Sequence, residues 1–153
     1  MSWTNLIKVC VRHEEEDSID TARLTAVIRE IHITSSCGST PLHFVALGKN
    51  TSLALWLLKN GACIEENDDN ETPLHWACKE GYLPMIKILL QQMTSQQIHQ
   101  KDIDGLAAAD WAEEYELSTE IISMLSPPSD NSKREGIVKY LNHVVSFALG
   151  DVF

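Results

Sequence analysis

The chain has 153 residues, with 22 Asp and Glu against 12 Lys and Arg, which gives a formal net charge of −10. We therefore expect no nucleic-acid partner, because such binding depends on neutralising phosphates with Lys and Arg. A hydrophobic content of 44% can form the core of one compact unit. No run reaches the ~18 apolar residues that a membrane span needs, so no membrane partner is expected.

The cysteines are spaced too widely to form a zinc-binding pair. They are Cys10, Cys37, Cys63 and Cys78. We interpret them as free thiols and expect neither a metal nor a cofactor. The N-terminus carries Lys8, Arg12 and then a run of acids, without the apolar core of a secretory signal. We therefore expect a location in the cytoplasm or nucleus, or in the host cytosol if the chain comes from a pathogen.

The first 31 residues predict two amphipathic helices on either side of the acidic run 14–17. Apolar residues recur there at helical spacing. They are Leu6, Ile7, Val9, Cys10, Ile19, Ala22, Leu24, Val27, Ile28 and Ile31.

The tetrapeptide Thr-Pro-Leu-His occurs at 40–43 and again at 72–75, 32 residues later. A threonine can cap the free N–H groups that open a helix, and proline is well suited to the first helical position. Each copy therefore predicts the start of a helix whose apolar face begins at the leucine.

The residues that follow each copy also match. Phe44-Val45-Ala46 corresponds to Trp76-Ala77-Cys78, and further apolar residues recur up to Gly61 in the first copy and Leu90 in the second. This pattern, with a period near 33, resembles the ankyrin-repeat family. The resemblance implies an all-α solenoid of stacked helix-turn-helix units with projecting loops. It also implies that His43 and His75 form hydrogen bonds between neighbouring repeats.

Local signals set the other helix ends. Asn50 or Thr51 can cap the second helix of the first full repeat, and Gly61 ends it. Gly81 ends the first helix of the next repeat, and Pro84 lies where its second helix begins. In the projecting loop 63–71, Asn70 takes the place of a left-handed glycine.

A degenerate third repeat begins at Gly105, with Asp110 in the histidine position and a second helix around 118–125. The resemblance also makes the N-terminal segment a divergent capping repeat. The predicted units are 1–37 for that cap, 38–69, 70–104 and 105–125 for the repeats, and 126–153 for a linker and a last helix.

The last helix is predicted over 132–149, after a break at 126–131 and a capping box. We expect it to cover an apolar end of the third repeat rather than to bind a partner. The apolar residues to be covered are Ile121, Ile122, Met124 and Leu125. The tail 151–153 resembles a carboxy-terminal ligand of a peptide-binding domain.

Two features predict a binding surface. Phe44, Trp76 and Trp111 occupy equivalent positions, which the family directs towards the concave face. We expect this aromatic stripe to contribute more to partner binding than to folding, the alternative being burial between adjacent helices. Trp56, by contrast, is expected in the core.

The second feature is the loop 63–71, which holds five acids. These could attract a basic partner, or could serve solubility and turn formation alone. The full set of predicted partner-binding residues is Phe44, Trp76, Lys79, Glu80, Trp111, Glu66, Asn67, Asp68, Asp69, Glu71, Lys101 and Ile103.

Catalysis has little support in the sequence. His75 and Cys78 share a helix face, but nothing completes a nucleophilic site, and there is no glycine-rich phosphate loop. We predict no enzyme and no small-molecule substrate, but an adaptor that is monomeric when free and binds another protein. The alternatives are an inhibitor that masks the basic surface of a regulator, or a stable subunit of a larger complex; each would suit a viral or pathogen protein directed at a host.

Overall fold

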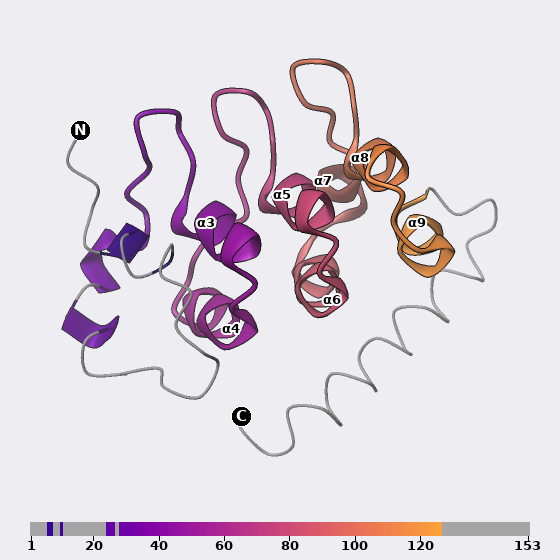
Figure 1. Cartoon of the computed structure of the whole chain (residues 1–153). Helices are drawn as coiled ribbons and strands as arrows, with labels where there is room; N and C mark the ends of the chain where they lie inside the picture. The colour runs from indigo at the N-terminus through magenta and orange to yellow at the C-terminus, as the bar shows by residue number, and fades with distance from the viewer. Residues whose placement is uncertain (1–5, 8–9, 11–23, 27, 127–153) are drawn as a thin grey trace.

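The computed structural model describes residues 6–7, 10, 24–26 and 28–126. Three helix pairs follow one another and stack side by side (Figure 1). They are α3 (Pro41–Gly48) with α4 (Thr51–Lys59), α5 (Pro73–Glu80) with α6 (Leu83–Gln92), and α8 (Ala108–Glu114) with α9 (Thr119–Leu125). A 3-10 turn, η1 (Ile28–Glu30), precedes them. The all-α solenoid is confirmed, since the described residues contain no strand beyond one isolated bridge between Lys101 and Ala107.

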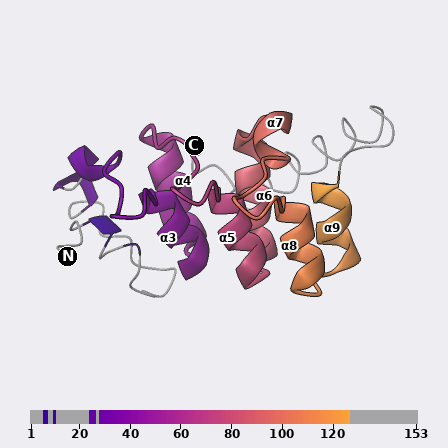
Figure 2. The same cartoon turned by 90° about the horizontal axis from the view of Figure 1, so that it is seen from above.

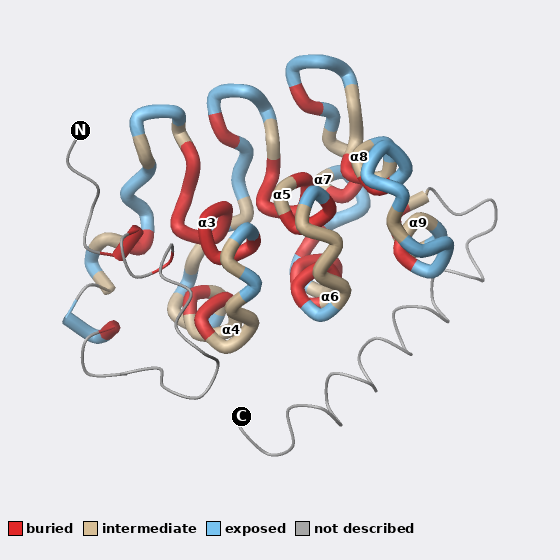
Figure 3. The backbone as a smooth tube through the Cα atoms, in the orientation of Figure 1, coloured by how far each residue is buried: buried red, intermediate tan, exposed pale blue. Residues whose placement is uncertain are grey.

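The helices form two rows. The first helices of the pairs, α3, α5 and α8, make the inner row, and α4, α6 and α9 make the outer row (Figures 1 and 2). Loops project beyond the inner row, and their tips are exposed (Figure 3). We name these loops finger 1 (33–39), finger 2 (63–71) and finger 3 (99–106).

The core runs continuously through the stack, because each helix pair buries its apolar face against its neighbours. Leu42 and Leu74, the leucines of the two tetrapeptides, are 1% and 0% exposed. The fully buried Leu57 and Leu89 occupy matching positions of the outer row. Trp56, expected in the core, packs against it while remaining partly exposed.

The predicted helix ends agree with the structure. Asn50 is the cap of α4, since its Oδ1 accepts the Leu53 N–H at 2.9 Å. Gly61 follows the end of α4 with φ +92°, and Gly81 ends α5 with φ +63°. Pro84 lies in the first turn of α6.

A short helix that the sequence analysis did not predict, α7 (Ser95–Ile98), lies between α6 and finger 3. Thr94 caps it, because the Thr94 Oγ1 accepts the Gln97 N–H at 3.3 Å while the Gln97 Oε1 accepts the Thr94 N–H at 2.9 Å. This is a capping box, and its Thr-x-x-Gln pattern is visible in the sequence. The Gln97 Nε2 also donates to the carbonyl of Ile64 at 3.1 Å, which ties α7 to finger 2.

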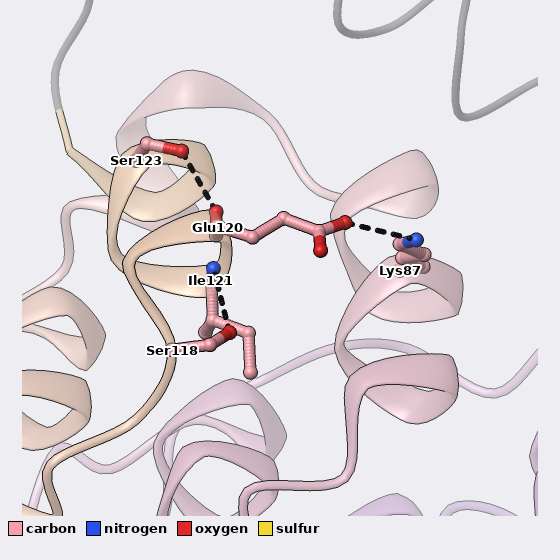
Figure 4. Close-up of polar contacts among 5 residues, drawn as sticks. All are labelled: Lys87, Ser118, Glu120, Ile121 and Ser123. Carbon is pink, nitrogen blue, oxygen red and sulfur yellow. Dashed lines mark hydrogen bonds and ion pairs between the residues drawn. The ribbon is translucent and has the colours of Figure 1, made fainter.

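Helix α9 packs beside α6. The Lys87 Nζ lies 3.4 Å from the Glu120 Oε1, and Ser118 caps α9 by accepting the Ile121 N–H at 3.5 Å (Figure 4). Ile121 and Leu125 are buried, at 4% and 1% exposed. Both residues thus belong to the core of the stack, with Ile122 and Met124 packed against it.

The N-terminal segment contributes to the core where the structure describes it. Leu6, Ile7, Cys10, Leu24 and Ile31 are each at most 5% exposed. The predicted helix 132–149, the tail 151–153 and most of the two predicted N-terminal helices lie outside the described residues.

Two residues other than glycine end inner helices in the left-handed conformation. Lys49 and Glu116, at φ +61° and +53°, occupy the position that Gly81 holds in the second repeat. An L-residue pays about 1–2 kcal/mol for this conformation.

We predict that Glu116→Gly raises the free energy of unfolding by about 0.5–1 kcal/mol, because glycine adopts a positive φ without steric cost. Urea unfolding measures the change. Glu116→Gln is the matched control, since it removes the charge and keeps the strained backbone. Equal stabilisation by both variants would show that charge repulsion, not backbone strain, is relieved.

Candidate partner-binding surface

Buried histidines join the repeats. The His43 Nδ1 accepts the Thr40 N–H at 3.0 Å within its own repeat, and its Nε2 lies 2.9 Å from the Glu71 carbonyl oxygen at the start of the next. Because a carbonyl only accepts, the Nε2 must carry the proton, so the ring is neutral. Burial agrees with this assignment, since it lowers the pKa of His43 to about 4.

The second histidine repeats this arrangement. The His75 Nδ1 accepts the Thr72 N–H at 3.0 Å, and its Nε2 donates to the Leu106 carbonyl at 3.2 Å. Burial lowers its pKa as well. The hydrogen bond between repeats that the family resemblance implied is therefore present twice.

The third repeat ends this series. Asp110, in the histidine position, accepts the Ala107 N–H at 2.7 Å and so keeps the bond within the repeat. An ionised carboxylate has no proton to donate to the carbonyl of a further repeat. Asp110 is exposed, as expected for the outer face of a terminal unit.

All three fingers contain the same type of turn. Ser35, Asn67 and Asp102 each use a side-chain oxygen to accept the N–H groups two and four residues further on, at 2.8–3.3 Å. A residue with positive φ follows three positions after each of them. In finger 2 it is Asn70, at φ +58°, which confirms the predicted left-handed asparagine.

Adjacent fingers are also linked to each other. The Asp68 N–H donates to the Cys37 carbonyl at 3.0 Å, and the Ile103 N–H donates to the Asp69 carbonyl at 2.9 Å. The first bond holds the tips of fingers 1 and 2 side by side, and the second those of fingers 2 and 3. The acids of finger 2 thus lie on a surface of fixed backbone.

The aromatic stripe lies between the repeats. The Trp76 ring packs edge-on against His43 and Phe44, at centroid distances of 5.1 and 5.6 Å, and its Nε1 donates to the Glu71 Oε2 at 2.7 Å. Phe44 is 8% exposed. These contacts favour the packing alternative, and Phe44 is too deeply buried to belong to a binding surface.

Trp111 repeats the arrangement one unit later. Its ring packs edge-on against His75 at 5.6 Å, and its Nε1 donates to the Asp102 Oδ2 at 2.8 Å. Burial opposes ionisation of Asp102, but the hydrogen bonds from Leu106, Trp111 and Asp104 outweigh it and lower the pKa of that carboxyl. Each inner tryptophan is therefore fixed by a carboxylate at the base of a finger.

The other predicted site residues fall into two groups. Asn67 is 6% exposed and forms the turn, Glu71 holds Trp76, and Glu80 pairs with Lys49 at 3.4 Å, so these three have structural partners. The second group is exposed and fit to meet a partner. It consists of Glu66, Asp68, Asp69, Lys79, Lys101 and Ile103.

The sequence analysis did not single out Glu114 and Tyr115. Both are exposed at the end of α8, and Tyr115 is 43% exposed with its ring 6.2 Å from that of Trp111. The signal that could have found Tyr115 is its spacing of four residues from Trp111, which places both on one helix face.

The third repeat is more acidic than the repeats before it. Between residues 102 and 126 the sequence contains no Lys, Arg or His, but seven acids. Asp102 is buried and Glu120 pairs with Lys87. The remaining five are exposed and are Asp104, Asp110, Glu113, Glu114 and Glu116.

The cysteine–histidine pair cannot act as a nucleophile. Burial raises the pKa of the Cys78 thiol to about 12, and His75 is already committed to Thr72 and Leu106. A thiolate is the reactive form, and this site disfavours it. No helix in the described part of the chain is long and apolar enough to cross a membrane, and its His, Cys, Asp and Glu residues form no group of three or more that could hold a metal ion.

Comparison with known proteins agrees with this geometry. A family model described as ankyrin repeats, in three copies, matches residues 6–102. The chain belongs to the ankyrin-repeat family. Ankyrin repeats are protein–protein interaction modules, so the protein is a binding module of this class.

The similar relatives are ankyrin-containing proteins of two kinds. The chain is 42% identical over 52 residues to the palmitoyltransferase ZDHHC13 of Mus musculus, covering 33% of this chain and 8% of that enzyme. It is 34% identical over 70 residues to the NF-kappa-B inhibitor alpha of Rattus norvegicus, covering 45% of this chain and 22% of the inhibitor. The matches thus span less than a quarter of either relative, and in the palmitoyltransferase they lie outside the catalytic region.

We predict that acidification below pH 6.5 destabilises the ankyrin stack. The folded pKa of His43, about 4, lies below the ordinary value of 6.5, so the unfolded chain takes up the proton more readily. Stability is therefore full above pH 6.5 and falls as the pH drops towards 4, by about 3 kcal/mol for this one group. His75 acts in the same direction.

Urea unfolding at a series of pH values measures this dependence. The account requires the free energy of unfolding to begin falling between pH 6.5 and 5. A constant value across that window would mean that the buried histidines are not held neutral.

We predict that Trp76→Ala lowers the free energy of unfolding by about 2 kcal/mol, because it removes a partly buried ring that packs against the preceding repeat. Trp76→Phe is the matched control, since it keeps a ring and loses only the hydrogen bond to Glu71. Thermal and urea unfolding check both. An unchanged unfolding transition in the alanine variant would contradict this structural role and favour the prediction that Trp76 binds the partner.

Proposed function

We propose that the protein binds a Lys- and Arg-rich segment of another protein through fingers 2 and 3 and the inner face of the third repeat. The observation that carries this proposal is the exposed, acidic surface of these elements. Glu65, Glu66, Asp68 and Asp69 are exposed on finger 2, and the exposed acids of the third repeat continue the same sign of charge.

The arrangement of the backbone supports this reading. The turn around Asn67 and the bond from Ile103 to Asp69 hold fingers 2 and 3 in place before any partner arrives. A preformed surface loses little conformational entropy on binding. Clustered carboxylates also accelerate association with a basic partner, because opposite charges steer the encounter.

One of the relatives supports masking as the form of binding. One of them is named as an inhibitor of NF-kappa-B and shares 34% identity over 70 residues with this chain. We therefore propose that the protein covers a basic surface of a regulator and so blocks what that surface would otherwise contact. An adaptor would instead bind the same segment without excluding its other ligand.

The first experiment separates masking from adaptor binding. A labelled peptide of alternating lysine and serine is first bound to duplex DNA, and the full-length protein is then added. Masking predicts release of the DNA as the protein takes the peptide. A ternary complex of peptide, DNA and protein would instead support an adaptor.

We predict that Glu66→Gln, Asp68→Asn and Asp69→Asn together weaken binding of this peptide about tenfold, since each exposed charge pair contributes up to about 1 kcal/mol. Fluorescence anisotropy measures the affinity. In the wild-type protein, raising the ionic strength to about 0.15 M should slow association, because screening acts over about 8 Å.

The matched control neutralises acids away from the proposed surface. Glu120 pairs with Lys87 between α6 and α9, so Glu120→Gln removes one charge without touching the fingers. An equal loss of affinity in that variant, charge for charge, would mean that net charge and not this surface attracts the peptide. No binding of the wild-type protein would contradict the proposed function itself.

A further inference from the structure

The third repeat exposes an aromatic pair that folding does not explain. Trp111 is partly exposed, Tyr115 is 43% exposed, and their ring centroids lie 6.2 Å apart at an interplanar angle of 45°. Tyr115 belongs neither to the buried core nor to the side chains packed against it.

Some acids of α8 are explained by their position at the end of the stack, but the aromatic pair is not. Asp110 and Glu113 occupy the positions of His75 and Cys78, which are buried in the second repeat. Acids there prevent the stacking of another repeat. Glu114 and Tyr115 instead occupy the positions of Lys79 and Glu80, which are exposed and half-buried in the second repeat. Their residue types need a different explanation.

The pair is also held in place. The Trp111 Nε1 is bonded to the Asp102 Oδ2 at 2.8 Å, and its ring packs against His75 on the preceding repeat. The Tyr115 N–H donates to the Trp111 carbonyl at 2.9 Å where α8 ends. Two aromatic rings are thus presented by a fixed backbone, and the exposed Glu114 directly precedes Tyr115 in the chain.

We propose that Trp111, Tyr115 and Glu114 form a subsite for an arginine side chain of the bound basic segment. A cation can lie within the ~6 Å range of cation–π attraction of both ring centroids, which are only 6.2 Å apart. A planar guanidinium stacks on aromatic rings and also bonds a carboxylate in a bidentate manner, whereas a lysine ammonium is a compact charge with a tighter hydration shell. The subsite therefore selects arginine over lysine.

This inference rests on the proposed function and adds to it a preference for arginine over lysine. The acids of finger 2 attract either basic side chain, because they act as charges on an exposed surface. The third repeat adds two neighbouring exposed or partly exposed rings and the exposed Glu114 at the end of α8. The basic segment is thereby oriented, with an arginine at the α8 end.

The test compares two peptides of equal length and charge, one alternating arginine with serine and the other lysine with serine. Each is titrated into full-length protein by fluorescence anisotropy. The wild-type protein is expected to bind the arginine peptide about two- to fivefold more tightly, as an exposed cation–π contact allows. Equal affinities would overturn the subsite while leaving the proposed function in place. Failure of both peptides to bind would overturn both proposals.

Two variants test which side chains produce the preference for the arginine peptide. Tyr115→Leu keeps an apolar side chain and removes the aromatic ring, and Glu114→Gln keeps the size of the side chain and removes its charge. Each is expected to lower affinity for the arginine peptide towards that for the lysine peptide. Glu120→Gln, on the outer helix α9, is the matched control for Glu114→Gln and should leave the ratio unchanged. An unchanged ratio in Tyr115→Leu, with the thermal transition intact, would overturn the proposal.

Discussion

The structure depends on one constraint, that a buried neutral histidine ring accepts a hydrogen bond at one nitrogen and donates one from the other. His43 and His75 accept from the threonine that opens their own helix and donate to a carbonyl of the next repeat. That carbonyl lies at the base of the following finger. The same two bonds therefore fix the start of a helix, the spacing of the repeats and the height at which each finger leaves the stack. The tryptophans that pack edge-on against these rings depend on the same placement.

The end of the histidine series connects folding with function. Asp110 keeps the bond to the start of its helix but offers no proton to a further repeat. The acids that replace buried residues at this end make it unsuitable for stacking, since a buried unpaired carboxylate is costly. They also leave a surface of one charge beside finger 2. The residues that stop the stack thus also create an acidic surface, without any additional element of structure. Glu114 and Tyr115 are not explained by the end of the stack.

The sequence predicted those features that depend on a few adjacent residues. The tetrapeptides at 40–43 and 72–75, the cap at Asn50 and the left-handed Asn70 each follow from local chemistry, and the structure has them all. The burial of Phe44 and the anchoring of Trp76 were not predictable in this way, because their partners lie on different repeats. Tyr115 was missed because its exposure depends on α8 ending at Glu114. Helix α7 could have been predicted from its Thr-x-x-Gln capping box, which depends only on neighbouring residues.

The central claim, that fingers 2 and 3 and the end of α8 form one surface for a basic segment, can be tested directly by mapping amide chemical shifts. The isotope-labelled full-length protein is titrated with the arginine–serine peptide at physiological ionic strength. The account predicts that the largest changes fall on residues 66–71, 103–105 and 110–116, with α4 and α6 little affected. Changes concentrated on the outer helices α4 and α6, or no saturable change at all, would contradict it.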